Sequence, residues 1–154
     1  MAIRTRVGQG FDIHRFIDGP SDRVLVLGGV KFPNEKPLAG HSDADVIAHA
    51  AADALLGAAS LGDIGMHFPD TDPQWAGANS LTLLAHVATI VREAGFEIGN
   101  VDCSIVCEKP RIAPHREEMQ KLLSDATGAT ITIKGRRAEG LGALGREEGI
   151  ACWA

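Results

Sequence analysis

Long charged side chains are missing from the middle of this chain. Between Pro37 and Val91 there is no lysine, arginine or glutamate, and aspartate and histidine are the only ionisable side chains. A helix that faces solvent normally carries long charged residues on its outer side, so this absence indicates that residues 41–56 do not form an ordinary surface helix. Burial of an unpartnered charge is costly, so we expect the aspartates and histidines to have partners.

Other absences narrow the class of protein. The three cysteines form no C-x-x-C pair and no disulfide framework, which favours a reducing compartment, and Cys103 and Cys107 are expected in the core. No run reaches the roughly 18 uninterrupted apolar residues of a membrane helix. The N-terminal segment lacks the apolar core of a secretion signal and shows no transit peptide, so we expect a cytoplasmic protein without a membrane partner. The net charge of −5 gives no general case for nucleic-acid binding.

The patterns that are present predict a globular α+β protein. With 154 residues and 45% hydrophobic content, the chain is long enough for one domain, residues 1–154, with a real core. Apolar and alternating runs predict strands at 3–10, 23–32, 97–108, 129–135 and 148–154, and helical periodicity predicts helices at 43–58, 80–95 and 113–128. Ser80 is expected to cap the second helix. This order predicts an α/β sandwich, a mixed β-sheet with helices packed on one face.

Two segments carry side chains that suit a metal ion. Asp12 and His14 are two residues apart, and on a strand this spacing puts both on one face. His49, on a helix packed across that strand, would complete the three ligands that a catalytic zinc uses. Asp45 and Asp53 flank His49 on the same helical stripe and are candidates to orient an imidazole. The alternative is a pair of buried histidines bonded to aspartates without a metal, which composition alone favours.

Other segments suit anions. His41 and Ser42 lie at the expected start of the first helix, where free N–H groups and the helix dipole attract phosphate, although Ser42 could simply cap the helix. The segment 134–149 contains five glycines and three arginines, a combination that suits phosphate oxygens. A flexible solvated loop is the alternative there. Turn chemistry alone would explain the segments 62–65 and 68–73.

Taken in order, these motifs resemble those of the 2-C-methyl-D-erythritol 2,4-cyclodiphosphate synthases. The similar segments are "GFDIHRF", "HSDADVIAHAAADALLGAASLGDIG", "FPDTDP", "GNVD", "KP-x-x-x-PH" and "GREEGIA", and they cover nearly the whole chain. The resemblance implies a phosphorus–oxygen lyase of the non-mevalonate isoprenoid pathway. Such an enzyme cyclises 4-diphosphocytidyl-2-C-methyl-D-erythritol 2-phosphate and releases CMP. The alternative is an inactive homologue that only binds a nucleotide or isoprenoid diphosphate, but such a binder has little need of Glu139.

The resemblance also implies roles for individual residues. Asp12, His14 and His49 would hold zinc, and Glu139 would hold a second divalent ion, magnesium or manganese. His41, Arg137 and Glu139 are the expected catalytic residues. Substrate contacts are expected from Asp12, Ile13, His14, His41, Ser42, Asp63, Ile64, Gly65, Phe68, Pro69, Asp70, Thr71, Asp72, Cys107, Lys109, Arg111, Arg137, Glu139 and Arg146. The family is a homotrimer with active sites between subunits, around a channel that Phe11, Arg146 and Glu148 would line.

One segment departs from the family pattern. Where relatives commonly have K-A-T-T-T-E-K-L-G-F-T-G-R, this chain has "KGRRAEGLGALGR" from Lys134 to Arg146. Threonines that usually contact phosphates are thus replaced by Arg136, Arg137 and Ala138. We hypothesise that Arg137 replaces a hydroxyl with a charged donor to the diphosphate. Its neighbour in extended chain, Arg136, would then point to the opposite side, toward solvent or another subunit.

Overall fold

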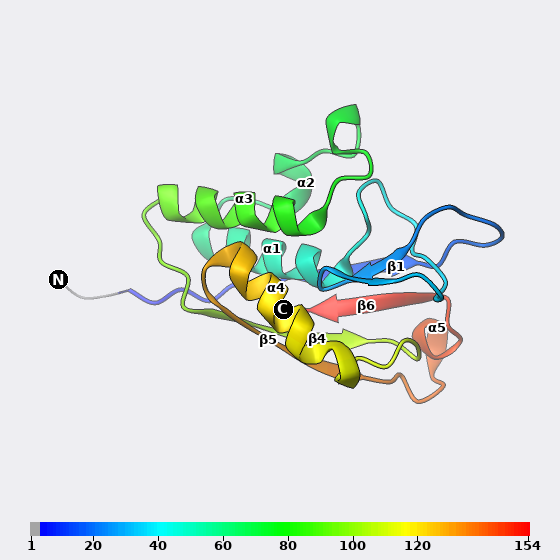
Figure 1. Cartoon of the computed structure of the whole chain (residues 1–154). Helices are drawn as coiled ribbons and strands as arrows, with labels where there is room; N and C mark the ends of the chain where they lie inside the picture. Colours follow the sequence, from blue (N-terminus) through cyan, green and yellow to red (C-terminus); the bar gives the residue numbers. More distant parts are fainter. Residues whose placement is uncertain (1–3) are drawn as a thin grey trace.

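A mixed four-stranded sheet forms the base of the molecule (Figure 1). The computed structural model describes residues 4–154. The strands are β1 (Phe11–Arg15), β4 (Asn100–Val106), β5 (Thr130–Arg136) and β6 (Gly149–Trp153), in the order β1-β6-β4-β5. β4 and β5 run parallel, whereas β6 is antiparallel to both β1 and β4. The sheet is therefore mixed, as the sequence predicted.

The first strand begins later than predicted. The prediction of a strand at 3–10 is wrong over residues 4–10, and residue 3 lies outside the described residues. Gly8 and Gly10 instead pass directly along the first long helix: a Cβ on Gly10 would lie 1.9 Å from the carbonyl oxygen of Ala50. Only glycine permits such a close backbone approach. It brings the following strand, with Asp12 on it, against the helix that carries His49.

The predicted strand at 23–32 is a hairpin. It divides into β2 (Leu25–Leu27) and β3 (Val30–Phe32), which pair antiparallel. The two residues between them, Gly28 and Gly29, have φ angles of 58° and 78°. Two consecutive left-handed residues are what a two-residue hairpin turn requires, and glycine adopts that conformation without steric cost.

The three predicted long helices are present, with shifted ends. They are α1 (Val46–Ala59), α3 (Ser80–Glu93) and α4 (Arg116–Thr127). α1 begins later than expected because Asp45 is its N-cap and accepts hydrogen bonds from the N–H groups of Ile47 and Ala48. The cap of α3 is Asn79, not the predicted Ser80. Short helical segments that the sequence did not indicate are α2 (Ile64–His67), η1 (Pro73–Trp75) and α5 (Gly142–Gly145). The first three residues of the helix predicted at 113–128 form a separate short helix, η2 (Ala113–His115).

The helices are stacked over one face of the sheet (Figure 1). α1 packs on β1, β6 and β4, α4 packs on β5, and α3 lies over α1 and α4. Alternate strand residues point into this core and are buried, including Val101, Cys103, Ile105, Ile131 and Ile133. The other face of the sheet exposes apolar side chains: Phe11 is 45% exposed, Ile13 50% and Trp153 39%. Within residues 4–154, no helix is long and apolar enough to cross a membrane.

Candidate functional site

Asp12, His14 and His49 converge as the sequence predicted. Each offers one ligand atom, and these atoms all lie within 4.8 Å of one another. His14 Nε2 is 3.1 Å and His49 Nδ1 3.0 Å from the same carboxylate oxygen, Oδ2 of Asp12. The strand supplies two ligands on the face turned toward α1, and the helix supplies the third.

The chemistry of this triad fits a divalent ion. Nδ1 of His14 lies 2.6 Å from the carbonyl oxygen of Ala39, which can only accept, so Nδ1 carries the proton and Nε2 presents its lone pair to Asp12. An imidazole lone pair and a carboxylate oxygen repel each other unless a proton or a metal ion lies between them. Burial alone would raise the pKa of Asp12, but when the rings of His14 and His49 are protonated, their hydrogen bonds and positive charge outweigh burial and lower that pKa far below its usual value. The three side chains therefore form an anionic pocket for a cation.

The two aspartates expected to orient the histidines bind backbone N–H groups instead. The carboxylate of Asp45 accepts hydrogen bonds from the N–H groups of Gly28 and Gly29, in addition to its two helix-capping bonds. It therefore ties the β2–β3 hairpin to the start of α1. Asp53 accepts a hydrogen bond of 2.7 Å from the N–H of Ile64 and so fixes the start of α2. The prediction that either carboxylate contacts an imidazole is wrong, because both are occupied by backbone N–H groups.

His41 and Ser42 lie beside the triad, but not at a free helix end. α1 starts at Val46, and the Asp45 side chain occupies the first N–H groups, so the prediction that His41 and Ser42 lie at the helix start is wrong. Ser42 is buried, and its hydroxyl oxygen lies 3.0 Å from Nε2 of His49. Arg23, which the sequence did not single out, donates hydrogen bonds to the carbonyl oxygens of Gly40 and Ser42. It holds this turn against the triad.

The loop between α1 and α3 folds toward His41. Nε2 of His41 lies 3.0 Å from the carbonyl oxygen of Asp72. The ring of Phe68 is buried and packs edge-on against Trp75 and His86. Asp63 caps α2 by accepting a hydrogen bond from the Met66 N–H. The remaining predicted contacts of this segment lie on α2 or in the loop: Ile64, Gly65, Pro69, Asp70 and Thr71.

A second group of the predicted residues lies at the β5 edge of the sheet. Cys107, Arg111 and Arg137 line a cleft of about 210 Å³, together with Glu108, Pro110, Ile112, Ala113, Arg116, Gly135 and Arg136. Arg136 and Arg137 both line this cleft. The opposite orientation of their side chains stays a prediction, and β5, with its alternation, ends at Arg136.

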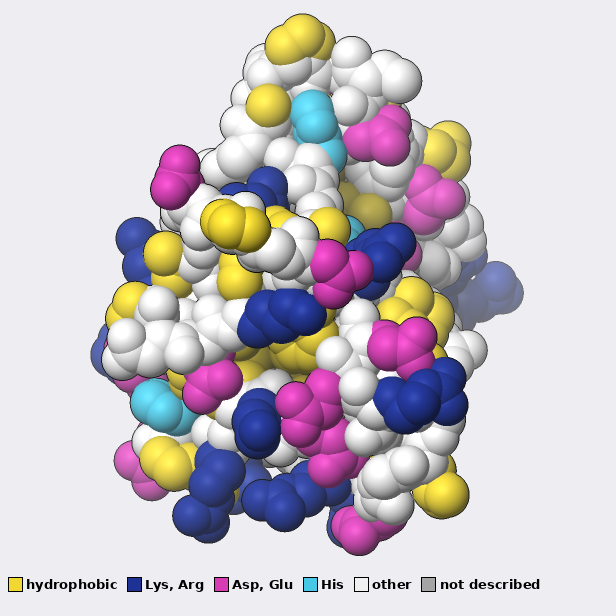
Figure 2. Space-filling view, turned by 90° about the vertical axis from the view of Figure 1, so that its right-hand side faces the viewer, with side chains coloured by type: hydrophobic (Ala, Val, Ile, Leu, Met, Phe, Trp, Pro, Cys, Tyr) yellow, Lys and Arg dark blue, Asp and Glu magenta, His cyan; other side chains and the backbone are white. Residues whose placement is uncertain are grey.

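The remaining predicted residues of this region are exposed. Lys109 pairs with Glu147 at 3.5 Å, and Arg146 donates a hydrogen bond of 2.7 Å to Glu148. Glu139 is exposed and has a left-handed φ of 55°. Figure 2 shows Lys and Arg side chains gathered at the lower end of one face, the end at which Figure 1 places β5 and α5.

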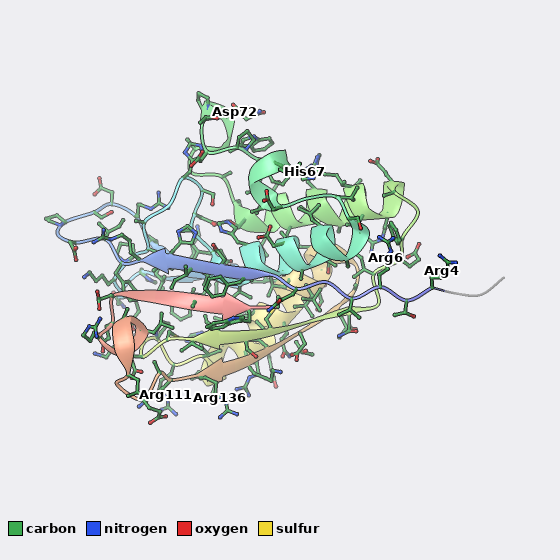
Figure 3. The ribbon with its side chains drawn as sticks, turned by 180° about the vertical axis from the view of Figure 1, so that it is seen from behind. Arg4, Arg6, His67, Asp72, Arg111 and Arg136 are labelled. Atoms are coloured by element: carbon green, nitrogen blue, oxygen red, sulfur yellow. The ribbon has the colours of Figure 1, made fainter. Side chains whose placement is uncertain are left out.

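The two groups of residues lie far apart within one chain. β1 and β5 are the opposite edges of the sheet, with β6 and β4 between them. Three strand spacings of about 4.8 Å separate the edges by roughly 14 Å. Figure 3 shows Asp72 at one end of the molecule and Arg111 and Arg136 at the other. Ile13 is further separated from the triad, because its side chain is on the opposite face of β1.

Comparisons with known proteins identify the family of this chain. A family model, the YgbB family, matches residues 5–154. A 2-C-methyl-D-erythritol 2,4-cyclodiphosphate synthase of Geobacillus thermodenitrificans is 52% identical over 149 residues, which cover 95% of this chain and 91% of the relative. The synthase of Bacillus cereus is 53% identical over 152 residues, 97% of this chain and 94% of the relative.

Solved structures show the same fold. IspF of Plasmodium falciparum in complex with CDP matches with a TM-score of 0.82 at 34% identity, covering 96% of this chain and 91% of that chain. The bifunctional IspDF of Campylobacter jejuni matches with a TM-score of 0.89 at 40% identity, covering 96% of this chain and 40% of that one. In sequence and in structure alike, the chain belongs to the YgbB family.

Proposed function

We propose that this protein converts 4-diphosphocytidyl-2-C-methyl-D-erythritol 2-phosphate into 2-C-methyl-D-erythritol 2,4-cyclodiphosphate and CMP. An oxygen of the 2-phosphate attacks the β-phosphorus, the bond from that phosphorus to the bridging oxygen breaks, and CMP leaves with this oxygen. The convergence of Asp12, His14 and His49 is the observation that carries the proposal. It occurs in a chain about half identical to named synthases along almost its whole length.

The triad is proposed to bind zinc. Two imidazoles and one carboxylate are a usual donor set for zinc that keeps a further position for a substrate atom. When bound, the ion supplies a positive charge that polarises a phosphate oxygen. The nucleophile is already an anion, so the protein has no need of a strong base, and its residues mainly position the phosphates and neutralise charge. His41 and Ser42, next to the triad, are proposed to contact a phosphate.

The cleft at the β5 edge is proposed to take the nucleotide. Its arginines suit the phosphates, and its backbone around Cys107 to Ala113 would contact cytosine. Burial, together with the charges of Glu108 and Glu35, raises the pKa of the Cys107 thiol to about 12, so this side chain is neutral and not a nucleophile. Glu139 would bind the second ion, because magnesium or manganese commonly uses one carboxylate plus phosphates and waters.

A homotrimer with active sites between subunits would bring the two groups together. Within one chain the triad and the arginine cleft lie on opposite edges of the sheet, so a single substrate is better placed to contact the triad of one copy and the cleft of the next. The uncovered sheet face supports such an assembly. Phe11 and Trp153 are paired across β1 and β6, with ring centroids 4.9 Å apart, and both are exposed next to Ile13.

Phosphorus NMR tests the reaction directly. Protein purified with zinc is incubated with the diphosphocytidyl substrate and magnesium, and we expect the diphosphate signals to be replaced by those of CMP and the cyclic diphosphate. Ser124→Ala, which changes a hydroxyl on α4 that bonds to the backbone of β5, serves as a matched active control. Tight substrate binding without CMP formation would contradict the proposal and identify a binding protein instead.

A further inference from the structure

A buried serine at the start of α3 contacts His49 on the side of its ring that faces away from Asp12. Ser80 is 1% exposed, and its hydroxyl oxygen lies 2.8 Å from Nε2 of His49. Because Asn79 caps α3, the hydroxyl of Ser80 is not used to cap the helix. Ser80 is the first helical residue and points into the space between α3 and α1. This contact was absent from the sequence-based expectations.

Asp43 completes a chain of three side chains. Its carboxylate accepts hydrogen bonds from both the backbone N–H and the hydroxyl of Ser80, the former at 2.9 Å. It also accepts a hydrogen bond of 3.1 Å from the N–H of Asp45, which fixes its position. The order of contacts is therefore Asp43, Ser80, His49 and then Asp12, with the imidazole nitrogen Nδ1 facing the triad.

The number of available protons determines the direction of these bonds. A hydroxyl has one proton, and a carboxylate only accepts, so Ser80 donates to Asp43 and must accept from Nε2–H of His49. With its proton on Nε2, neutral His49 presents the Nδ1 lone pair to the triad. Ser42 also lies within 3.0 Å of Nε2, but its hydroxyl could either donate or accept and would permit both tautomers. Ser80 with Asp43 permits only one.

We infer that Ser80 and Asp43 are positioning residues that hold His49 in the tautomer that binds metal through Nδ1. They reach the site only through His49, as residues that donate or accept behind a metal-binding imidazole do. Ala39 acts in the same way on His14, where a backbone carbonyl fixes the tautomer. The inference rests on the proposed zinc site, and it predicts an effect on metal affinity that is independent of turnover.

Zinc affinity of the purified full-length protein tests the inference. In competition with a chelator, Ser80→Ala is expected to bind zinc about 10- to 100-fold more weakly, which is the usual effect of removing such a partner. In the metal-free protein, ¹⁵N NMR of His49 should change from a single Nε2–H tautomer to a mixture. Asp43→Asn should shift both measurements in the same direction but less. The double variant should bind zinc no more weakly than Ser80→Ala alone, because both act through one contact.

The controls separate positioning from folding. Ser124→Ala, on α4 and away from the triad, should leave zinc affinity and the His49 tautomer unchanged. If Ser80→Ala does not fold, Asp43→Asn alone decides the question by its tautomer spectrum. An unchanged tautomer and unchanged zinc affinity in the folded variant, or fully additive losses in the double variant, would overturn the inference. Retention of zinc in His49→Ala would instead contradict the proposed zinc site itself.

Discussion

At the β1 edge of the sheet the ligand groups are enclosed, whereas at the β5 edge they are open to solvent. The side chains of Asp12, His14 and His49 are only 23%, 22% and 11% exposed, and each contacts another member of the triad. The cleft at the β5 edge contains four exposed arginines, Arg111, Arg116, Arg136 and Arg137. The ion pairs found among residues 4–154 include none of these four.

This difference in exposure indicates what holds the side chains of each site in place. The triad is positioned by contacts within the chain, because β1 packs on α1 and each histidine has a hydrogen-bond partner on the ring side away from Asp12. Exposed arginines keep their rotamer freedom and lose it only when a phosphate or a neighbouring subunit binds. Loss of a triad residue at the β1 edge should therefore abolish function, whereas loss of one exposed arginine at the β5 edge should only reduce it.

The largest expected effect is loss of the metal. We expect about one zinc per chain in the parent protein and almost none in His49→Ala, because two remaining ligands bind zinc poorly. Cyclisation should fall below detection in the same variant. Elemental analysis of protein purified without added zinc measures the metal content. A metal content unchanged by His49→Ala would show that the triad is not the zinc site.

His41→Ala should have the next largest effect. His41 touches none of the three ligands in the structure, and its Nε2 contacts a loop carbonyl, so zinc content and folding should be unaffected. Turnover should fall about 10²- to 10³-fold, the usual loss when one donor to a developing charge is removed. Rate measurements beside zinc analysis and circular dichroism check this. A variant that unfolds, but whose folded fraction is fully active, would show that His41 is structural.

Part of this site could be predicted from the sequence because Asp12 and His14 are close together in the chain. The two-residue step from Asp12 to His14 determines that both share a strand face, whatever the rest of the fold. The same argument does not extend past Arg136, because β5 and its alternation end there. Asp45 could not be assigned from its helical position, because its partners, Gly28 and Gly29, are 16 to 17 residues away in sequence.

The long-range partners were missed for the same physical reason. Ser80 and His49 are 31 residues apart, and a serine at a helix start predicts a cap rather than a contact with another helix. Arg23 contacts backbone carbonyl groups, and such partners cannot be recognised from residue types. The three long helices and the central strands were predictable, since hydrophobic periodicity reports one buried face. Their ends shifted because the caps depend on tertiary contacts.

Mixing two inactive variants should restore part of the activity. His49→Ala disables the β1 edge and Glu139→Ala the β5 edge, so each alone should be nearly inactive. If every site combines the triad of one subunit with the loop of the next, random mixed trimers should recover about a quarter of the parent activity. Subunits are exchanged by joint refolding, and native mass spectrometry confirms the mixed trimers. Mixed trimers without activity, or a fully active monomer in sedimentation, would contradict the shared site.

The smallest effect is expected for substitutions of Arg137, which lines the exposed cleft at the β5 edge. A fixed positive charge two residues from Glu139 competes with the second metal ion for that carboxylate, so Arg137→Thr should lower the magnesium concentration needed for half-maximal activity. Exposed charge pairs contribute only about 0.2–1 kcal/mol, so the change should be about fivefold at most. Arg137→Ala should lower the requirement similarly but weaken phosphate binding. Arg136→Ala removes a charge from the same cleft and is the matched control, since its effect on magnesium should be smaller. Magnesium titrations of all three variants decide the matter, and equal, negligible shifts would mean that these arginines form only a solvated surface.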